Sequence, residues 1–154
     1  MKFSLRESVA EDEPFIERLL KVTLAEELMA HAWPEPMRDN LLSMQYRGRR
    51  QSVVSVYPNT AVQIISMDGE DAGWLVVART DEAICLADIA LLPERRGAGV
   101  GTAILETLIQ ESRDSRKPVR LHVMINNPAA RLYERMGFRP VHDDQVNREM
   151  ERLP

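Results

Sequence analysis

The chain of 154 residues has little cysteine, few aromatic side chains and no strongly basic character. Its single cysteine, Cys85, excludes a disulfide within the chain and fits a reducing compartment. The formal net charge of −4 argues against a dedicated nucleic-acid-binding protein, because such proteins are usually basic. The sequence has no N-terminal signal pattern and no long uncharged apolar run, so we expect a cytoplasmic protein without a membrane partner.

Two common nucleotide-binding motifs are also missing. The dinucleotide motif G-x-G-x-x-G fails in both possible registers, because its last position would be Thr102 or Ile104. A P-loop requires Gly-Lys followed by Ser or Thr, and the chain contains no Gly-Lys dipeptide. The absence of both motifs excludes a dinucleotide-binding fold and a P-loop nucleotide-binding protein. No residue pattern in the chain predicts a metal site.

Glycine is scarce but concentrated, since three of the seven glycines occur in Arg96-Gly97-Ala98-Gly99-Val100-Gly101-Thr102. This segment lies between an apolar strand pattern and a helix pattern. Glycine leaves the backbone N–H groups uncovered, and the start of a helix adds further unpaired N–H groups and a positive dipole end. The segment therefore predicts a binding site for a phosphorylated cofactor, and on the glycines alone a tight structural turn is the alternative.

Hydrophobic periodicity predicts an α/β protein. We expect strands near residues 3–9, 61–67, 73–79, 84–92, 119–125, 138–142 and 146–152, the fourth of them buried on both faces. We expect helices from Pro14 past Leu28, at about 37–50, at 102–114, and between Asn127-Pro128 and Gly137. The length of 154 residues predicts one domain, 1–154. The order β-α-α-β-β-β-α-β-α-β-β implies a mixed sheet with helices on both of its faces.

A second motif follows the strand at 119–125. It reads Asn126-Asn127-Pro128-Ala129-Ala130-Arg131-Leu132-Tyr133-Glu134-Arg135-Met136-Gly137-Phe138. Together with Arg96-Gly97-Ala98-Gly99-Val100-Gly101, this segment resembles the GNAT acetyltransferase superfamily. That family carries an Arg/Gln-x-x-Gly-x-Gly/Ala loop after its fourth strand, then an Asn, Leu-Tyr-Glu and Gly-Phe after its fifth. The resemblance covers about residues 61–152.

The resemblance implies a mostly antiparallel sheet in which parallel strands 4 and 5 splay apart, and it implies acetyl-CoA as the cofactor. The pyrophosphate would lie on the N–H groups of the glycine loop, and the pantetheine arm would run beside the end of strand 4. A backbone N–H near Leu91 would polarise the acetyl carbonyl. The cofactor-binding residues it implies are Ala90, Leu91, Leu92, Arg96, Gly97, Ala98, Gly99, Val100, Gly101, Thr102, Asn126 or Asn127, and Tyr133.

Two residues are candidates for proton transfer. By its family position, Tyr133 would protonate the leaving thiolate, and its alternative role is packing on the sheet. Asp88 is the one charged residue within the apolar run 84–92, so it needs a partner, water or a catalytic role. We consider it as the base that deprotonates the acceptor, against a structural hydrogen bond to a neighbouring element.

Other polar residues have weaker functional interpretations. In the family that the chain resembles, the first helix borders the pocket for the acceptor. Glu26 and Glu27 are adjacent on this helix, so at most one of them would face that pocket. His122 is more often a structural strand residue than a base. His31 and Trp33 could line the pocket, although a cap and a packed tryptophan are the simpler interpretations. The arginines at 47, 49 and 50 would lie at the C-terminus of a helix, where their positive charge complements the helix dipole. Cys85 would be a small buried hydrophobic residue.

The function that the resemblance implies is acetyl-CoA-dependent N-acetyl transfer to a primary amine, which would be a small molecule or a peptide. The reaction would be direct attack in a ternary complex. Transfer of another acyl group and a non-catalytic acyl-CoA-binding module are the alternatives. Members of the family often pair through sheet edges, so a homodimer is also open.

Overall fold

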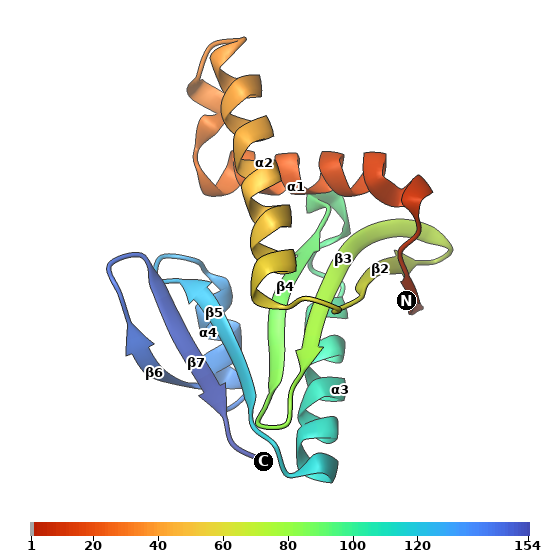
Figure 1. Ribbon diagram of the computed structural model, residues 1–154, viewed down its shortest axis with the longest axis vertical. Helices are drawn as coiled ribbons and strands as arrows, with labels where there is room; N and C mark the ends of the chain where they lie inside the picture. Colours follow the sequence, from red (N-terminus) through yellow and green to blue (C-terminus); the bar gives the residue numbers. More distant parts are fainter. Residues whose placement is uncertain (1) are drawn as a thin grey trace. The chain divides into compact units, whose positions relative to one another are not determined.

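The computed structural model describes residues 2–154 and shows seven strands and four α-helices over that range (Figure 1). In chain order they are β1 (Phe3–Glu7), α1 (Glu13–Glu27), α2 (Met37–Val56), β2 (Val62–Met67), β3 (Glu70–Arg79), β4 (Ile84–Leu91), α3 (Val100–Ser115), β5 (Val119–Met124), α4 (Ala129–Arg135), β6 (Arg139–Asp143) and β7 (Asn147–Arg152). This order confirms the predicted succession of strands and helices. None of the described helices is both long enough and apolar enough to cross a bilayer.

The strands form one mixed sheet in the order β1-β2-β3-β4-β5-β7-β6. The pairs β1–β2, β2–β3, β5–β7 and β6–β7 are antiparallel. Strands β4 and β5 are parallel, in a register that joins Ile84 with Val119 and ends at Leu86 with Leu121. This arrangement confirms the predicted fold class.

The chain divides into two compact units, and β3 and β4 each contribute residues to both. The first unit comprises the chain up to Val76 together with Asp88–Ala98. The second comprises Val77–Ala87 and Gly99–Pro154. A single domain over 1–154 stays a prediction.

In the first unit, α1 begins with Pro14 in its first turn, where the missing N–H of proline costs nothing. Its buried face includes Ile16, Leu19 and Leu20. The last turn packs against α2 through a small cluster around Leu24 and Leu42. Figure 1 shows α2 crossing α1 steeply. This packing fixes the end of α1 next to the first half of α2.

Helix α2 extends six residues beyond the predicted end at Arg50 and reaches Val56. The β-branched residues after Arg50 have a low intrinsic helix propensity, which made an earlier end plausible. The observed end is explained by Pro58, because a proline disfavours helical geometry at the residue before it. The three arginines at 47, 49 and 50 therefore lie inside the helix, and the expected helix C-terminus at this position is wrong.

Tight backbone geometry shapes the sheet in the first unit. The β2–β3 turn has positive φ at Asp68 (51°) and Gly69 (84°), which is the geometry of the predicted two-residue hairpin. Further along β3, a Cβ on Gly73 would lie 2.2 Å from the carbonyl oxygen of Ala90. Glycine at this position therefore allows the backbone of β3 to come close to the end of β4.

In the second unit, α3 buries Ile104, Leu105 and Leu108, and β5 alternates buried and more exposed residues as predicted. Helix α4 contacts β5 and ends at Arg135, and Gly137 just beyond it has a φ of +95°, the left-handed geometry expected after a helix. Burial of β4 on both faces is wrong: Ile84, Leu86 and Ala90 are buried and the other five residues are intermediate. The part of β4 that belongs to the first unit carries Asp88, which pairs with Arg49 of α2 and so occupies part of the strand's surface.

Candidate functional site

The glycine loop adopts the backbone geometry that favours glycine. Gly97 and Gly99 have φ of +82° and +86°, a region that side-chain-bearing residues seldom adopt. Gly99 directly precedes α3, and Ala103 N–H donates to its carbonyl at 3.0 Å. The chain thus reverses at two glycines and enters a sixteen-residue helix, as the sequence pattern predicts.

Backbone donors accumulate along this loop. Within residues 2–154, no protein acceptor receives a hydrogen bond from the backbone N–H groups of residues 97–102. A Cβ built on Gly97, Gly99 or Gly101 would meet no other atom within 4 Å. A row of unpaired N–H groups beside open space, at a helix start, suits the diphosphate of a nucleotide cofactor. The residues present therefore fit coenzyme A.

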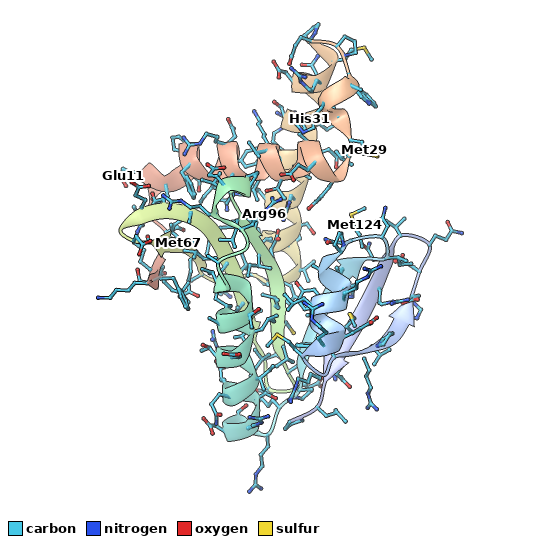
Figure 2. All side chains as sticks on the ribbon, turned by 180° about the vertical axis from the view of Figure 1, so that it is seen from behind. Glu11, Met29, His31, Met67, Arg96 and Met124 are labelled. Atoms are coloured by element: carbon cyan, nitrogen blue, oxygen red, sulfur yellow. The ribbon has the colours of Figure 1, made fainter. Side chains whose placement is uncertain are left out.

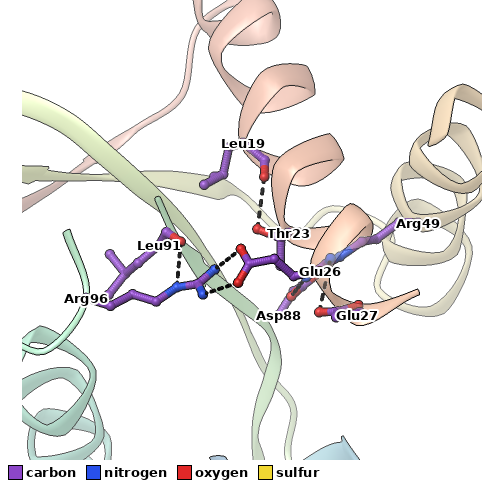
Figure 3. A network of polar contacts seen from close by, with 8 residues as sticks. All are labelled: Leu19, Thr23, Glu26, Glu27, Arg49, Asp88, Leu91 and Arg96. Carbon is purple, nitrogen blue, oxygen red and sulfur yellow. Dashed lines mark hydrogen bonds and ion pairs between the residues drawn. The ribbon is translucent and has the colours of Figure 1, made fainter. Parts of the chain in front are cut away.

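Arg96, the first residue of the loop, is anchored on both sides of its guanidinium. Its Nε donates to the carbonyl oxygen of Leu91 at 3.2 Å, and its two Nη atoms donate to Glu26 at 2.9 and 3.2 Å (Figure 3). In Figure 2, Arg96 lies close to α1. These contacts connect the end of β4 to the last turn of α1, within the first unit.

The end of β4 carries the three residues expected beside the pantetheine arm. Ala90 is buried, and Leu91 accepts the bond from Arg96. The N–H of Leu92 donates to Ala72 at 2.8 Å, so that donor is already used within the protein. The contacts of Ala90, Leu91 and Leu92 with a cofactor stay predictions.

Asp88 has a partner that the sequence did not reveal. Its two carboxylate oxygens accept from Arg49 of α2, from Nε at 2.6 Å and from Nη2 at 2.5 Å. Both side chains are largely buried, with 18% of Arg49 and 13% of Asp88 exposed. The guanidinium also lies 6.0 Å from the ring centre of the fully buried Trp74. The structural hydrogen bond considered for Asp88 is therefore present, and its role as a base stays a prediction.

The two neighbouring carboxylates at the end of α1 point to different arginines, as adjacent helical residues must (Figure 3). Glu26 is paired with Arg96. Glu27 lies 3.9 Å from Nη1 of Arg49, which is an ion-pair distance but too long for a hydrogen bond. Burial raises the pKa of Glu27, and the nearby Asp88 adds to this, whereas Arg49 opposes it.

In the second unit, Tyr133 lies on α4 with 8% of its surface exposed. Its ring meets that of Phe138 edge-on, with centroids 5.8 Å apart. Asn127 is half-buried, and its Oδ1 accepts from the N–H of Ala129 at 2.9 Å, which confirms the predicted cap. Asn126 is exposed. The catalytic role of Tyr133 and the choice between the two asparagines stay predictions.

Two histidines, a tryptophan, a cysteine and three arginines are the other candidates that the sequence offers. His122 is 64% exposed and lies 3.9 Å from Glu149 on the neighbouring strand. His31 is on the connection after α1 (Figure 2), and Trp33 is 43% exposed, so a packed tryptophan is wrong. Cys85 is half-buried. The expected dipole role of the arginines is wrong as well, because Arg49 pairs with Asp88 and Arg50 pairs with Glu13 at 2.6 Å.

Comparison with known proteins identifies the family. A family model described as the acetyltransferase (GNAT) domain matches residues 58–140. A search of the curated proteins gave no significant match to the sequence.

Solved structures share the fold along the whole chain. PaiA N-acetyltransferase from Thermoplasma acidophilum, solved with coenzyme A, has 16% identity and a TM-score of 0.73, with 100% of both chains covered. An acetyltransferase from Thermus thermophilus has 18% identity and a TM-score of 0.70, covering 100% of this chain and 98% of that one. The ribosomal-protein-S18-alanine N-acetyltransferase from Escherichia coli has 21% identity and a TM-score of 0.62, covering 99% and 94%. At these identities the likeness shows the fold alone.

Proposed function

The chain belongs to the GNAT acetyltransferase family, and on this premise we propose that it transfers the acetyl group of acetyl-CoA to a primary amine by direct attack in a ternary complex. One observation carries the proposal. The backbone N–H groups of residues 97–102 have no acceptor in the described chain, and they lie where glycine Cβ positions would meet open space. This is the arrangement that a diphosphate requires.

The loop residues Arg96, Gly97, Ala98, Gly99, Val100, Gly101 and Thr102 would hold the diphosphate of coenzyme A. Ala90, Leu91 and Leu92 would accompany the pantetheine arm, together with Asn126 or Asn127. When bound, acetyl-CoA supplies an acetyl group activated as a thioester. The protein's contribution is to orient this group and to manage protons at the acceptor nitrogen and at the leaving sulfur.

The reaction requires that the acceptor nitrogen lose a proton and that the leaving sulfur gain one. An alkylammonium with a pKa of about 10.4 is roughly 99.9% protonated at pH 7, so a base must free its lone pair. The departing sulfur needs a proton, and the hydroxyl of Tyr133 can donate one. The phenol has a pKa of about 10 and a thiol about 8.5, which places the two groups close enough for efficient transfer.

Two measurements on the purified chain test this function. Acetyl-CoA should raise the melting temperature, and a primary amine added with it should release free thiol and form the N-acetyl product, detected by mass spectrometry. Propionyl-CoA, tested in parallel, separates acetyl transfer from transfer of a larger acyl group. Binding of acetyl-CoA without thiol release for any primary amine would instead identify a non-catalytic acyl-CoA-binding module.

A further inference from the structure

Three carboxylates meet two guanidiniums in the first unit, and they are not equally satisfied. Glu26 accepts two hydrogen bonds from Arg96, and Asp88 accepts two from Arg49. Glu27 receives none from any described residue, and its nearest cationic atom is Nη1 of Arg49 at 3.9 Å. Figure 3 shows all three carboxylates in one view, from α1 and β4.

Arg49 donates two hydrogen bonds to Asp88 and none to Glu27, whose carboxylate oxygens can still accept hydrogen bonds. The guanidinium uses Nε and Nη2 for Asp88, whereas its Nη1 is buried without a hydrogen-bond partner. Asp88 therefore has a donor on each of its oxygens. Glu27 accepts no such hydrogen bond within residues 2–154, so a proton taken by its carboxylate displaces none.

The surroundings of Glu27 also favour its protonated form. The charged groups that face it are Arg49 on α2, Asp88 on β4, Arg96 before α3, and Glu26 on its own helix. Burial raises the pKa of Glu27, Asp88 and Glu26 raise it further, and the two arginines oppose them. Glu27 is also the last residue of α1, where the negative end of the helix dipole disfavours another negative charge.

The same network has an excess of negative charge, because three carboxylates face two guanidiniums. A cation that approaches Glu27 would balance it. The side chain of Glu27 is 31% exposed, so a solvent-borne group can reach it. This accessibility distinguishes Glu27 from Asp88, which is 13% exposed.

We propose that Glu27 is the base that takes the proton from the acceptor's ammonium group, and that the Arg49–Asp88 pair positions the surrounding elements. The inference rests on the proposed function and adds to it the residue that would deprotonate the acceptor. Asp88 is on this assignment a positioning residue, in place of the catalytic role that its sequence context suggests.

The proton and electron balance is complete without another reactant. The ammonium N–H bond breaks as the proton moves to a carboxylate oxygen of Glu27, and the nitrogen keeps the electron pair. The nitrogen then bonds to the acetyl carbon while the carbon–sulfur bond breaks. The sulfur retains that bond's electrons and takes a proton from Tyr133. The nitrogen then gives up its second proton, which returns through solvent to the Tyr133 phenolate, and Glu27 releases its own proton to solvent.

Steady-state kinetics on the full chain test this assignment with Glu27→Gln, Asp88→Asn and a control, Glu17→Gln. Glu17 lies on the same helix and contacts Lys21 at 3.5 Å. The acceptors are n-butylamine, an alkylamine with a pKa near 10, and an alanyl peptide whose α-amine has a pKa of about 8. The α-amine is partly deprotonated at neutral pH and depends less on a base.

For Glu27→Gln we expect kcat/KM with n-butylamine to fall by about 100-fold or more, and with the peptide by less. The acidic limb of the pH–rate profile should disappear, because Glu27 must be deprotonated to act and loses this ability as the pH falls through its raised pKa. The KM for acetyl-CoA should not change. The Glu17→Gln control should match the parent, and Glu27→Asp should recover part of the rate and of the acidic limb.

Two outcomes overturn the assignment while leaving the proposed function intact. One is an active parent whose Glu27→Gln and Glu27→Asp variants, folded by circular dichroism, both keep the full rate and the acidic limb. The other is loss of that limb in Asp88→Asn but not in Glu27→Gln, which would make Asp88 the base. A parent that releases no thiol with any primary amine overturns the proposed function and this inference together.

Discussion

Arg49 and Asp88 are 39 residues apart in the sequence, yet the guanidinium donates to both oxygens of the carboxylate, at 2.6 and 2.5 Å. The pair joins the middle of α2 to the second half of β4 within the first unit. It is also the centre of the charged network that includes Glu27. Bidentate pairs of this kind are strong and geometrically specific, because the planar guanidinium matches the carboxylate.

The pair should show strong energetic coupling. Replacing Arg49 by Met leaves Asp88 largely buried without its cation, and we expect a loss of about 2–4 kcal/mol in the free energy of unfolding. Asp88→Leu alone leaves Arg49 with only the more distant Glu27, at 3.9 Å. The double variant should lose clearly less than the sum of the two, measured by urea denaturation. Additive losses in this double-mutant cycle would mean that the pair contributes little.

Tyr133→Phe tests the acid that protonates the leaving sulfur. The substitution keeps the ring that meets Phe138 edge-on and removes the hydroxyl. We expect kcat to fall by about 100-fold, with the acetyl-CoA-induced rise in melting temperature retained. Unchanged turnover, measured by thiol release, would exclude the hydroxyl as the proton donor.

Gly101→Ala tests the phosphate-binding loop with little risk to the fold. Gly101 lies in the first turn of α3, and an added Cβ would meet no atom within 4 Å, which is also true of Gly48 in α2. Each alanine should stabilise its helix by about 0.5–1 kcal/mol. We expect only Gly101→Ala to weaken acetyl-CoA binding, measured by thermal shift and calorimetry.

Equal acetyl-CoA affinity in the Gly101→Ala and Gly48→Ala variants would remove the loop from the cofactor site. Gly99→Val is a less suitable probe, because φ at Gly99 is +86° and a β-branched residue is strained there even though the space is open. A loss of binding in that variant would mix the effect of the side chain with that of a distorted backbone.

Asp12 should make stability depend on pH in the acidic range. Two hydrogen bonds from Arg6, with a further one from the N–H of Val9, lower the pKa of Asp12 to about 2 from its ordinary 3.8. The stabilisation is complete above the ordinary value and is lost as the pH falls toward 2. Because 43% of Arg6 is exposed, we expect it to amount to about 1–2 kcal/mol.

The measurement is urea denaturation of Asp12→Asn and of the parent from neutral pH down to about pH 2. The difference between the two proteins should be full at neutral pH and should shrink below about pH 4. The exposed neighbour Glu11 serves as the control, since Glu11→Gln removes one carboxylate charge and leaves the Arg6–Asp12 contact in place. A difference that does not depend on pH would assign the effect of Asp12→Asn to packing.

Local signals explain how much of the fold could be predicted. The Asp68–Gly69 hairpin, the glycine loop before α3 and the turn at Gly137 just beyond α4 each depend on positive φ, which glycine adopts without strain. The end of α2 was predicted too early because weak helix formers follow Arg50, and packing against α1 outweighs that preference.

Within the candidate site, the sequence identified a residue in an unusual context but not its partner. Asp88 stood out because a charge inside an apolar strand demands a partner. Arg49 gave no matching signal, because an arginine on a helix usually belongs to a solvated face. Glu26 and Glu27 were indistinguishable in the sequence, since adjacent glutamates have the same chemistry and their environments depend on residues 70 and 22 positions away.

The sequence by itself determined the order of strands and helices, the glycine loop at 96–102 and the resemblance to GNAT acetyltransferases, because these depend on backbone preferences and short-range spacing. Only the tertiary structure decided that Asp88 accepts a hydrogen bond on each of its oxygens whereas Glu27 accepts none from any residue that the structure describes. Hydrogen bonds between side chains distant in sequence depend on where the folded backbone brings α1, α2 and β4 together. The loop therefore indicates how the acetyl donor is held, and the network around Glu27 indicates how an amine acceptor would be prepared.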